Sequence, residues 1–369
     1  MKRLVICMML VILITMTGCA AQKESKTEVT DTSAGSSETV SITDMAGRTV
    51  EIPKTIDQTL SRSPVGTLIM YTLNPEKIAG QNWEPSEGEK KYLDKDFLAL
   101  PMLSGWYADG KVGNVEEIVK AAPDVIFSSF SGKATQGTID QANSIQEQLK
   151  IPVVMIDSSL DSMSKTYEFV GNLVKEEKRA DELGKYIDNL LSDVKTKVAT
   201  IDDQKRISVY YAEGTEGLQT DPSGSEHSQL IDLIGAVNVA QVEIKSGMGR
   251  SSVSLEQLLQ WAPEVIIACH DQGFSAESIT YEVVLSDDRF KTLDAVKNKK
   301  VYEVPFQPFN FIDRPPSVNR IIGIKWLGNL LYPETYNYNL DKDTKEFYKL
   351  FYNIDLTAEQ INEIYKNSK

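Results

Sequence analysis

A helix–proline–strand pattern occurs twice along the chain, first over residues 114–126 and again over residues 254–266. Each copy opens with a residue that can cap a helix, Asn114 or Ser254, and has a glutamate at its third position. Each helical stretch ends at a proline, which an acid and an apolar strand-like run follow. A chance match of a common pattern is the alternative, but both acids and the proline coincide in the two copies. We therefore expect two lobes of similar α/β build.

The apolar residues of the repeat and of the rest of the chain predict how each lobe is layered. In the two repeat helices we expect a core-facing stripe formed by Ile118 and Val119 in one copy and by Leu258 and Leu259 in the other. Continuous apolar runs separated by helical stretches are typical of parallel sheets that are covered on both faces. The predicted strands are Val125–Phe127, Val153–Ile156, Ile207–Tyr211, Val265–Ala268 and Val301–Val304.

Between the two copies lies a strongly helical stretch, Met163–Ala199. Its two apolar stripes are separated by Lys175–Arg179, which has no apolar member and predicts a break. At 1.5 Å per residue, a helix over Lys178–Ala199 would run about 33 Å, long enough to cross from one lobe to the other. Because a helical crossing is stiffer than a strand hinge, we expect only small lobe motions on binding.

The chain begins with a segment typical of a secretory signal. Two basic residues precede an apolar run of about 13 residues, Leu4–Met16, which is shorter than the ~20 residues of a membrane span. The following Met16-Thr17-Gly18-Cys19 resembles the lipobox of bacterial lipoproteins; the alternative is an ordinary signal with a chance cysteine. We predict a signal peptide over residues 1–18, a lipid anchor at Cys19 on the extracytoplasmic face of the cell membrane, and a flexible polar tether over residues 19–40.

Charge and residue counts exclude several classes of function. The chain has 39 Lys and Arg against 53 Asp and Glu, a net charge of -14, which disfavours a nucleic-acid partner. Three cysteines and two histidines are too few for a disulfide framework or a dedicated Cys/His metal cage. The sequence contains no nucleophile elbow, zinc-protease motif, phosphate-binding loop or paired-cysteine motif, so we do not expect an enzyme.

Several short motifs in a fixed order resemble one family. They are the opening Thr43–Val50, the Gly105-Trp106-Tyr107 tripeptide, the two Pro-acid-Val-Ile repeats and Asp313–Ser317. Together they are similar to the substrate-binding proteins of ABC importers, in the subclass with a rigid helical connector that serves siderophores, haem, vitamin B12, and some metal chelates or oxyanions. The resemblance covers roughly residues 41–335.

The resemblance implies an architecture and a set of partners. It implies two Rossmann-like α/β lobes, residues 41–165 and 205–369, joined by a helical connector over residues 166–204, with the ligand cleft between the lobes. The C-terminal helices are counted with the second lobe. The implied partners are an ABC permease and its ATPase. A monomer is expected, and no resident cofactor, because any metal would belong to the ligand.

The repeated glutamates acquire a role from this resemblance. In the vitamin B12 importer, one glutamate on each lobe docks onto arginines of the permease, seven residues ahead of the proline. The corresponding residues here are Glu116 and Glu256. The alternative is that each glutamate only complements the dipole of its own helix.

Ligand-site candidates come from the rule that open α/β sheets bind ligands at the carboxyl ends of their strands. Arginine suits anionic groups and aromatic side chains suit a flat organic ligand. The candidates, some placed by the resemblance, are Arg62, Trp106, Tyr107, Phe130, Tyr211, Arg250, His270, Phe309, Phe311 and Arg314. The alternatives are core packing for the aromatic residues and surface charge for the arginines.

These candidates predict an anionic metal chelate, a ferric siderophore or haem. A corrinoid and an oxyanion such as molybdate or tungstate stay open, as do a lipid-anchored sensor or adhesin and, last, a metallo-enzyme. Two roles stay open for His270, an axial iron ligand or a packing residue. Whether Cys269 contacts metal also stays open. His227 is expected to be a surface or capping residue.

Overall fold

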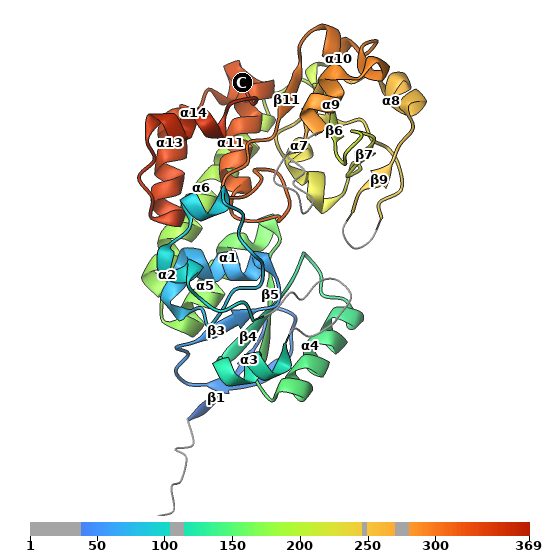
Figure 1. The fold of residues 1–369 in the computed structure, drawn as a ribbon. Helices are drawn as coiled ribbons and strands as arrows, with labels where there is room; N and C mark the ends of the chain where they lie inside the picture. Colours follow the sequence, from blue (N-terminus) through green and yellow to red (C-terminus); the bar gives the residue numbers. More distant parts are fainter. Residues whose placement is uncertain (1–37, 104–113, 246–248, 270–279) are drawn as a thin grey trace, which may run out of the picture. The chain divides into compact units, whose positions relative to one another are not determined.

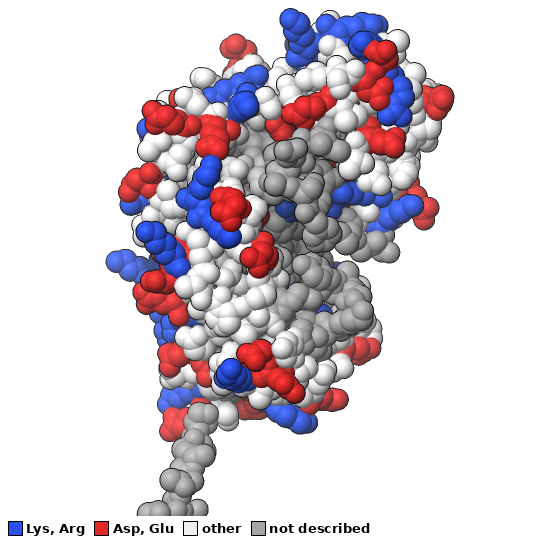
Figure 2. Space-filling model, in the orientation of Figure 1, with Lys and Arg blue, Asp and Glu red and all other residues white. Residues whose placement is uncertain are grey.

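The computed structural model describes residues 38–103, 114–245, 249–269 and 280–369. All the helices and strands described lie within Glu38–Lys369. Within the described residues, no helix is both long and apolar enough to cross a membrane. On the face shown in Figure 2, acidic and basic side chains are interspersed over the surface.

The first lobe is built on a parallel sheet in the order β3 (Thr59–Ser61), β4 (Val125–Phe130), β5 (Val153–Asp157). Successive residues of β4 enter different cores, since Ile126 packs with α3 and α4 and Phe127 packs with α1 and α5. Helices therefore cover both faces, as continuous apolar strands require (Figure 1). The remaining elements are the antiparallel pair β1 (Thr39–Thr43) and β2 (Thr49–Pro53), and α1 (Pro64–Leu73), α2 (Lys95–Leu98), α3 (Val115–Ala121), α4 (Gln136–Leu149) and α5 (Met163–Val174).

The second lobe repeats this layering. Its parallel sheet has the order β11 (Val301–Glu303), β10 (Val265–Ala268), β6 (Ser208–Ala212), β8 (Val237–Asn238). Ile266 packs with α8, α9 and α10, whereas Ile267 lies in the core shared with α7 and α11. The other elements are the antiparallel pair β7 (Gln219–Thr220) and β9 (Ser251–Ser252), and α7 (Gln229–Leu233), α8 (Leu255–Trp261), α9 (Thr280–Ser286), α10 (Asp294–Lys297) and α11 (Arg320–Leu331).

The two repeat helices, α3 and α8, are alike in length and in both ends. Asn114 and Ser254 cap them, and each ends at an alanine in the left-handed conformation before its proline. Ile118 and Leu258 are fully buried, as predicted. The prediction was wrong for their neighbours, because Val119 is 51% and Leu259 39% exposed. Helices of seven residues rest on their sheet through one buried position, and the next residue is rotated about 100° away from it.

The helical stretch between the lobes is two helices, not one. α5 ends at Val174, and the next residue, Lys175, has a left-handed φ of 63°. α6 (Glu177–Val198) begins two residues after Lys175. α5 packs on α1 and β5 of the first lobe, while α6 also contacts α7 and α12 (Pro333–Tyr336). The sequence-predicted boundary between residues 165 and 166 falls inside α5.

The C-terminal helices contact both lobes. They are α13 (Leu340–Phe347), the π-helical turn Tyr348–Tyr352 and α14 (Ala358–Ile364). The rings of Tyr348 and Tyr92 lie 5.7 Å apart between centroids, which ties this segment to the first lobe. Trp326 Nε1 donates to the carbonyl of Ser368 at 2.8 Å, which ties its end to α11. One continuous hydrophobic core therefore runs through both lobes and the C-terminal helices.

Candidate ligand-binding site

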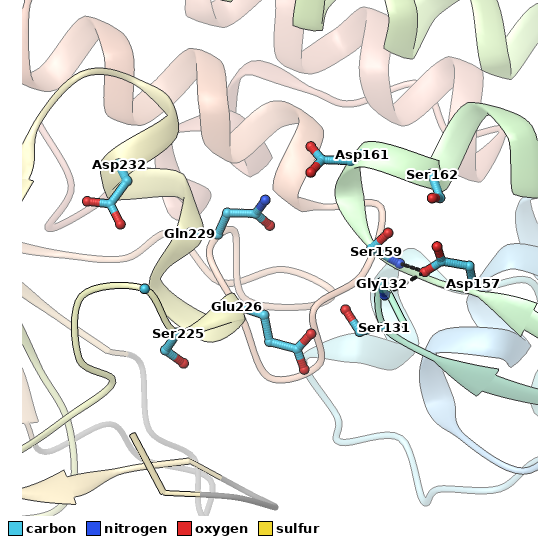
Figure 3. A pocket seen from close by; sticks show the side chains of 11 residues that line it. Ser131, Gly132, Asp157, Ser159, Asp161, Ser162, Ser225, Glu226, Gln229 and Asp232 are labelled. Carbon is cyan, nitrogen blue, oxygen red and sulfur yellow. Dashed lines mark hydrogen bonds between the residues drawn. The ribbon is translucent and has the colours of Figure 1, made fainter. Parts of the chain in front are cut away.

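A cavity of about 410 Å³ lies between loops of the two lobes (Figure 3). In the first lobe the loops after β4 and β5 line it, and Asp157 Oδ1 joins these loops by accepting from the amides of Gly132 at 2.9 Å and Ser159 at 3.0 Å. In the second lobe the wall is the start of α7 and the turn before it. The cavity lining contains Asp157, Asp161, Glu226 and Asp232, and among the described residues that line it there is no lysine or arginine. This part of the cleft is therefore polar and acidic.

Arg62 follows β3 at the carboxyl edge of the first sheet. Its Nη1 donates to Ser128 Oγ at 3.0 Å, and its amide donates to the carbonyl of Phe127 at 2.9 Å. Burial lowers the pKa of Arg62 from its usual value, although the guanidinium stays charged at neutral pH. The next residue, Ser63, caps α1, whose first turn has no acidic residue. A guanidinium and the positive end of a helix thus lie together at this edge, an arrangement that favours an anion.

Arg314 and Arg250 share the same buried acids in the second lobe. Arg314 donates from Nε to Glu213 Oε1 at 2.8 Å and from Nη2 to Asp221 Oδ2 at 2.6 Å. Arg250 Nε lies 3.3 Å from the same Glu213 oxygen, and its amide donates to Asp221 Oδ1 at 3.0 Å. Both carboxylates are fully buried, whereas the arginine side chains are 19% and 23% exposed. The acids therefore hold two partly exposed guanidinium groups from the interior side.

Both arginines adopt backbone conformations that L-residues rarely use. The φ angle is 62° at Arg314 and 65° at Arg250, in the left-handed region. Such conformations persist where the surrounding structure over-determines them, and they gather at functional sites. The hydrogen bonds to Glu213 and Asp221 hold Arg314 and Arg250 in these conformations.

Burial has a marked effect on the protonation of this network. It raises the pKa of Glu213 to about 8, with the nearby Arg314 acting against the rise. Burial also acts to lower the pKa of Arg314, but Glu213 and Asp313 outweigh it and raise that pKa above its usual value. Glu213 is therefore largely neutral below about pH 8, so it does not cancel the positive charges of Arg250 and Arg314.

His227 connects this network to the acidic cavity. Its Nδ1 lies 2.8 Å from Asp313 Oδ2, and its Nε2 lies 3.9 Å from Glu226 Oε1, a cavity-lining group. Burial acts to lower the pKa of His227, but the hydrogen bond and charge of Asp313 outweigh it, so the pKa is raised. The expectation of a surface or capping residue was wrong, because the ring is mostly buried and paired.

Asp221, His227 and Asp313 have ligand atoms within 4.8 Å of one another, a spacing that could hold a metal ion. Arg314 lies against two of the three, at 2.6 Å from Asp221 and 3.6 Å from Asp313. A guanidinium thus already supplies the positive charge that these carboxylates require. We therefore describe the cluster as an arginine–acid network.

The aromatic candidates in the described residues lie in the hydrophobic core. Phe130 ends β4 and is 8% exposed, and Tyr211 on β6 is fully buried. Phe309 packs edge-on against Trp83 at 5.6 Å, and Phe311 against Tyr365 at 6.1 Å. In this structure these four residues have the packing role that was the alternative for each. Trp106, Tyr107, His270 and Cys19 lie outside the described residues. Cys269 is fully buried and within 3.5 Å of Asn310 Nδ2.

Sequence reasoning missed the acids that organise the site. Glu213 lies directly after β6, so the strand-end rule that selected Tyr211 could also have selected it. Asp221 is far along the chain from both arginines and carries no local signal. The predicted docking acids, Glu116 and Glu256, are exposed at the starts of α3 and α8.

Comparison with known proteins decides the family. Residues 108–308, more than half of the chain, match the family model described as periplasmic binding protein. The chain belongs to this family. It is 27% identical to the molybdate-binding protein MolA of Haemophilus influenzae over 336 residues, which cover 84% of this chain and 90% of that protein. It is 25% identical to YvrC, an uncharacterized ABC transporter substrate-binding lipoprotein of Bacillus subtilis, over 80% of this chain and 87% of that protein.

Solved structures agree with this assignment. An ABC transporter solute-binding protein from Sulfurospirillum deleyianum superposes with a TM-score of 0.79 at 31% identity, over 88% of this chain and 99% of that one. MolA bound to molybdate superposes with a TM-score of 0.68 at 24% identity, over 86% and 99% of the two chains. The resemblance inferred from the sequence and the two-lobe α/β fold are thus confirmed. The protein is a substrate-binding protein of an ABC transporter, works with a permease and an ATPase, and is not an enzyme.

Proposed function

We propose that the protein captures an anionic, metal-containing ligand outside the cytoplasm and delivers it to its permease. The observation that carries the proposal is the pair Arg250 and Arg314, oriented by shared buried acids and still partly exposed. Arg62, with the N-terminus of α1, supplies a second positive region at the carboxyl edge of the other sheet. Oriented guanidinium groups recognise oxygen-rich anions through charge-assisted, bidentate hydrogen bonds.

Among such anions, we place a compact oxyanion of the molybdate class first. Four predicted aromatic contacts are buried in the core, so the described residues offer little flat apolar surface for a large organic ligand. The acidic wall formed by Asp157, Asp161, Glu226 and Asp232 would repel an extended polyanion that reached past the arginines. MolA, one of the relatives, is named for molybdate. A ferric siderophore or haem, the ligand expected from the sequence, comes second, followed by a corrinoid.

We also propose that Cys19 carries a lipid that anchors the protein on the extracytoplasmic face of the membrane. The lipobox-like Met16-Thr17-Gly18-Cys19 supports this, as does the polar segment that follows it. YvrC, a relative over most of the chain, is described as a lipoprotein.

Calorimetric titration tests the choice of ligand. Wild-type protein, Arg314→Ala and the matched surface variant Arg289→Ala are each titrated with molybdate, tungstate, a ferric siderophore, haemin and cobalamin. We expect the oxyanions to bind wild type and Arg289→Ala equally and Arg314→Ala much more weakly. Binding of a ferric chelate with no oxyanion binding would move the assignment to the second candidate. A neutral or cationic ligand, found by native mass spectrometry of protein purified from its host, would overturn the proposal.

A further inference from the structure

We infer that Val119 on α3 and Leu259 on α8 are a matched pair of apolar contacts that the permease covers when the protein docks. The inference rests on the assignment to an ABC importer and extends the docking role predicted for Glu116 and Glu256. Neither Val119 nor Leu259 is among the ligand candidates, so the two ideas can fail separately.

The two side chains occupy the same position of the internal repeat. Each lies three residues after the repeated glutamate, so the acid and the apolar group share one face of their helix. Val119 is 51% and Leu259 39% exposed, while the preceding Ile118 and Leu258 are fully buried and attach the helices to their lobes. A single exposed apolar residue is ordinary on a protein surface. Here exposure recurs at equivalent positions of two lobes whose cores do not need these side chains.

The chemistry of this acid–apolar pair selects the occupant. Its complement is an apolar surface beside a basic group, presented twice by two equivalent halves of one partner. A second copy of this chain would set acid against acid, within a protein of net charge -14. A membrane surface with anionic headgroups would also repel Glu116 and Glu256. A permease built from two equivalent subunits can present an apolar surface beside a basic group twice, once to each lobe.

The two parts of the pair respond differently to salt. Attraction between exposed charges weakens as ionic strength rises, because the Debye length falls to about 3 Å at 1 M salt. Burial of apolar area persists under the same conditions. We therefore expect the acids to give the salt-sensitive part of docking and Val119 with Leu259 to give a part that high salt does not remove.

The experiment measures association of the full-length protein with the purified permease–ATPase complex of its own host, held in lipid nanodiscs, at low and at high salt. The test variant is Val119→Thr with Leu259→Gln, which keeps size while adding polar atoms. The matched control is Val237→Thr with Leu285→Gln, whose native side chains are 41% and 40% exposed on β8 and α9. Thermal unfolding and titration with molybdate accompany each protein.

We expect the test variant to associate about 10- to 100-fold more weakly than the control at both salt concentrations, from the apolar area lost at two sites. Its unfolding temperature and molybdate binding should match those of the control. The inference is overturned if the test and control variants associate equally, whether both keep the affinity of the wild type or both lose the same part of it. If wild type binds no molybdate yet the variants differ in docking, the ligand assignment fails and this inference stands. If Glu116→Ala with Glu256→Ala abolishes docking while the test variant docks normally, the acids alone dock the protein.

Discussion

The guanidinium of Arg314 donates to the buried carboxyl of Glu213 at 2.8 Å, across 101 positions of sequence. An arginine selected as a ligand contact is thus oriented by an interior acid whose pKa burial raises to about 8. The acid helps to set the direction of the guanidinium, while its own neutral form leaves the positive charge available to a ligand. An anion-binding arginine requires a guanidinium that buried groups orient and that stays partly exposed to its ligand.

Replacing Arg314 with Ala should lower both affinity and stability. Loss of one partner of a buried charged pair costs about 2–5 kcal/mol of binding free energy and about 3–5 kcal/mol of unfolding free energy. Arg314→Lys should recover part of the affinity, because lysine lacks the bidentate fork. Titration and urea unfolding check this; a fall in stability with unchanged affinity would make Arg314 purely structural.

Glu213 should make the protein less stable as pH rises. Burial lifts its pKa in the folded protein from the usual 4.5 to about 8. The folded state therefore holds a proton that the unfolded state has lost in this range, so this group's contribution is full below pH 4.5 and is lost as pH rises through about 8. Glu213→Gln, which mimics the protonated acid, should flatten the decline. Urea unfolding at a series of pH values measures it; identical pH profiles for both proteins would contradict the assignment.

Gly323→Ala should disturb the loop that carries Arg314. A Cβ atom at Gly323 would lie 1.8 Å from the backbone carbonyl of Phe311, so α11 or the loop must move. We expect a loss of at least about 1–3 kcal/mol in unfolding free energy and weaker ligand binding. Gly137→Ala on α4 is the control, since its Cβ would meet no atom nearer than 3.8 Å. That variant should be unchanged or slightly more stable. Similar stability of both variants would show that α11 does not fix the loop.

Glu116→Ala with Glu256→Ala should abolish uptake and leave ligand affinity intact. Both glutamates are exposed at helix starts, so neither supports the core. Lys120→Ala with Gln260→Ala, which alters an exposed residue one turn further along each helix, is the matched control. If the acids serve only the helix dipole, the double glutamate variant should lose about 0.3–1 kcal/mol per helix in stability and import normally. Transport of labelled ligand into cells, beside thermal unfolding, separates the two roles.

Cys19→Ser should release the protein from the membrane or block cleavage of the signal segment. The thiol is the group that a lipobox presents for lipidation, and serine cannot form the thioether. Cell fractionation and metabolic labelling with a fatty acid check the outcome, with Cys269→Ser as the control because that thiol is buried. Continued lipid labelling of Cys19→Ser would show that the anchor lies elsewhere.

Local patterns in the sequence determined the two-lobe layering and the break at Lys175. A proline stop, a capping residue and a continuous apolar strand act over a few residues, so they remain visible in one dimension. The helix–strand repeat therefore predicted α3–β4 and α8–β10. The same patterns could not tell Val119 from Ile118, because both are apolar and only packing decides which of two adjacent residues faces the sheet.

Tertiary structure alone decided the composition of the site and the position of the C-terminal helices. Glu213 follows the parallel strand β6, Asp221 and Arg250 flank the antiparallel pair β7–β9, and Arg314 lies in the segment between β11 and α11. The fold brings these four residues together, which no local spacing encodes. Burial of Phe309 and Phe311 likewise depends on partners distant in sequence, Trp83 and Tyr365. The C-terminal helices reach the first lobe through Tyr348 and Tyr92 because both lobes share one core. Apolar burial is non-directional, so a sequence shows which side chains seek a core and the fold determines which core they join.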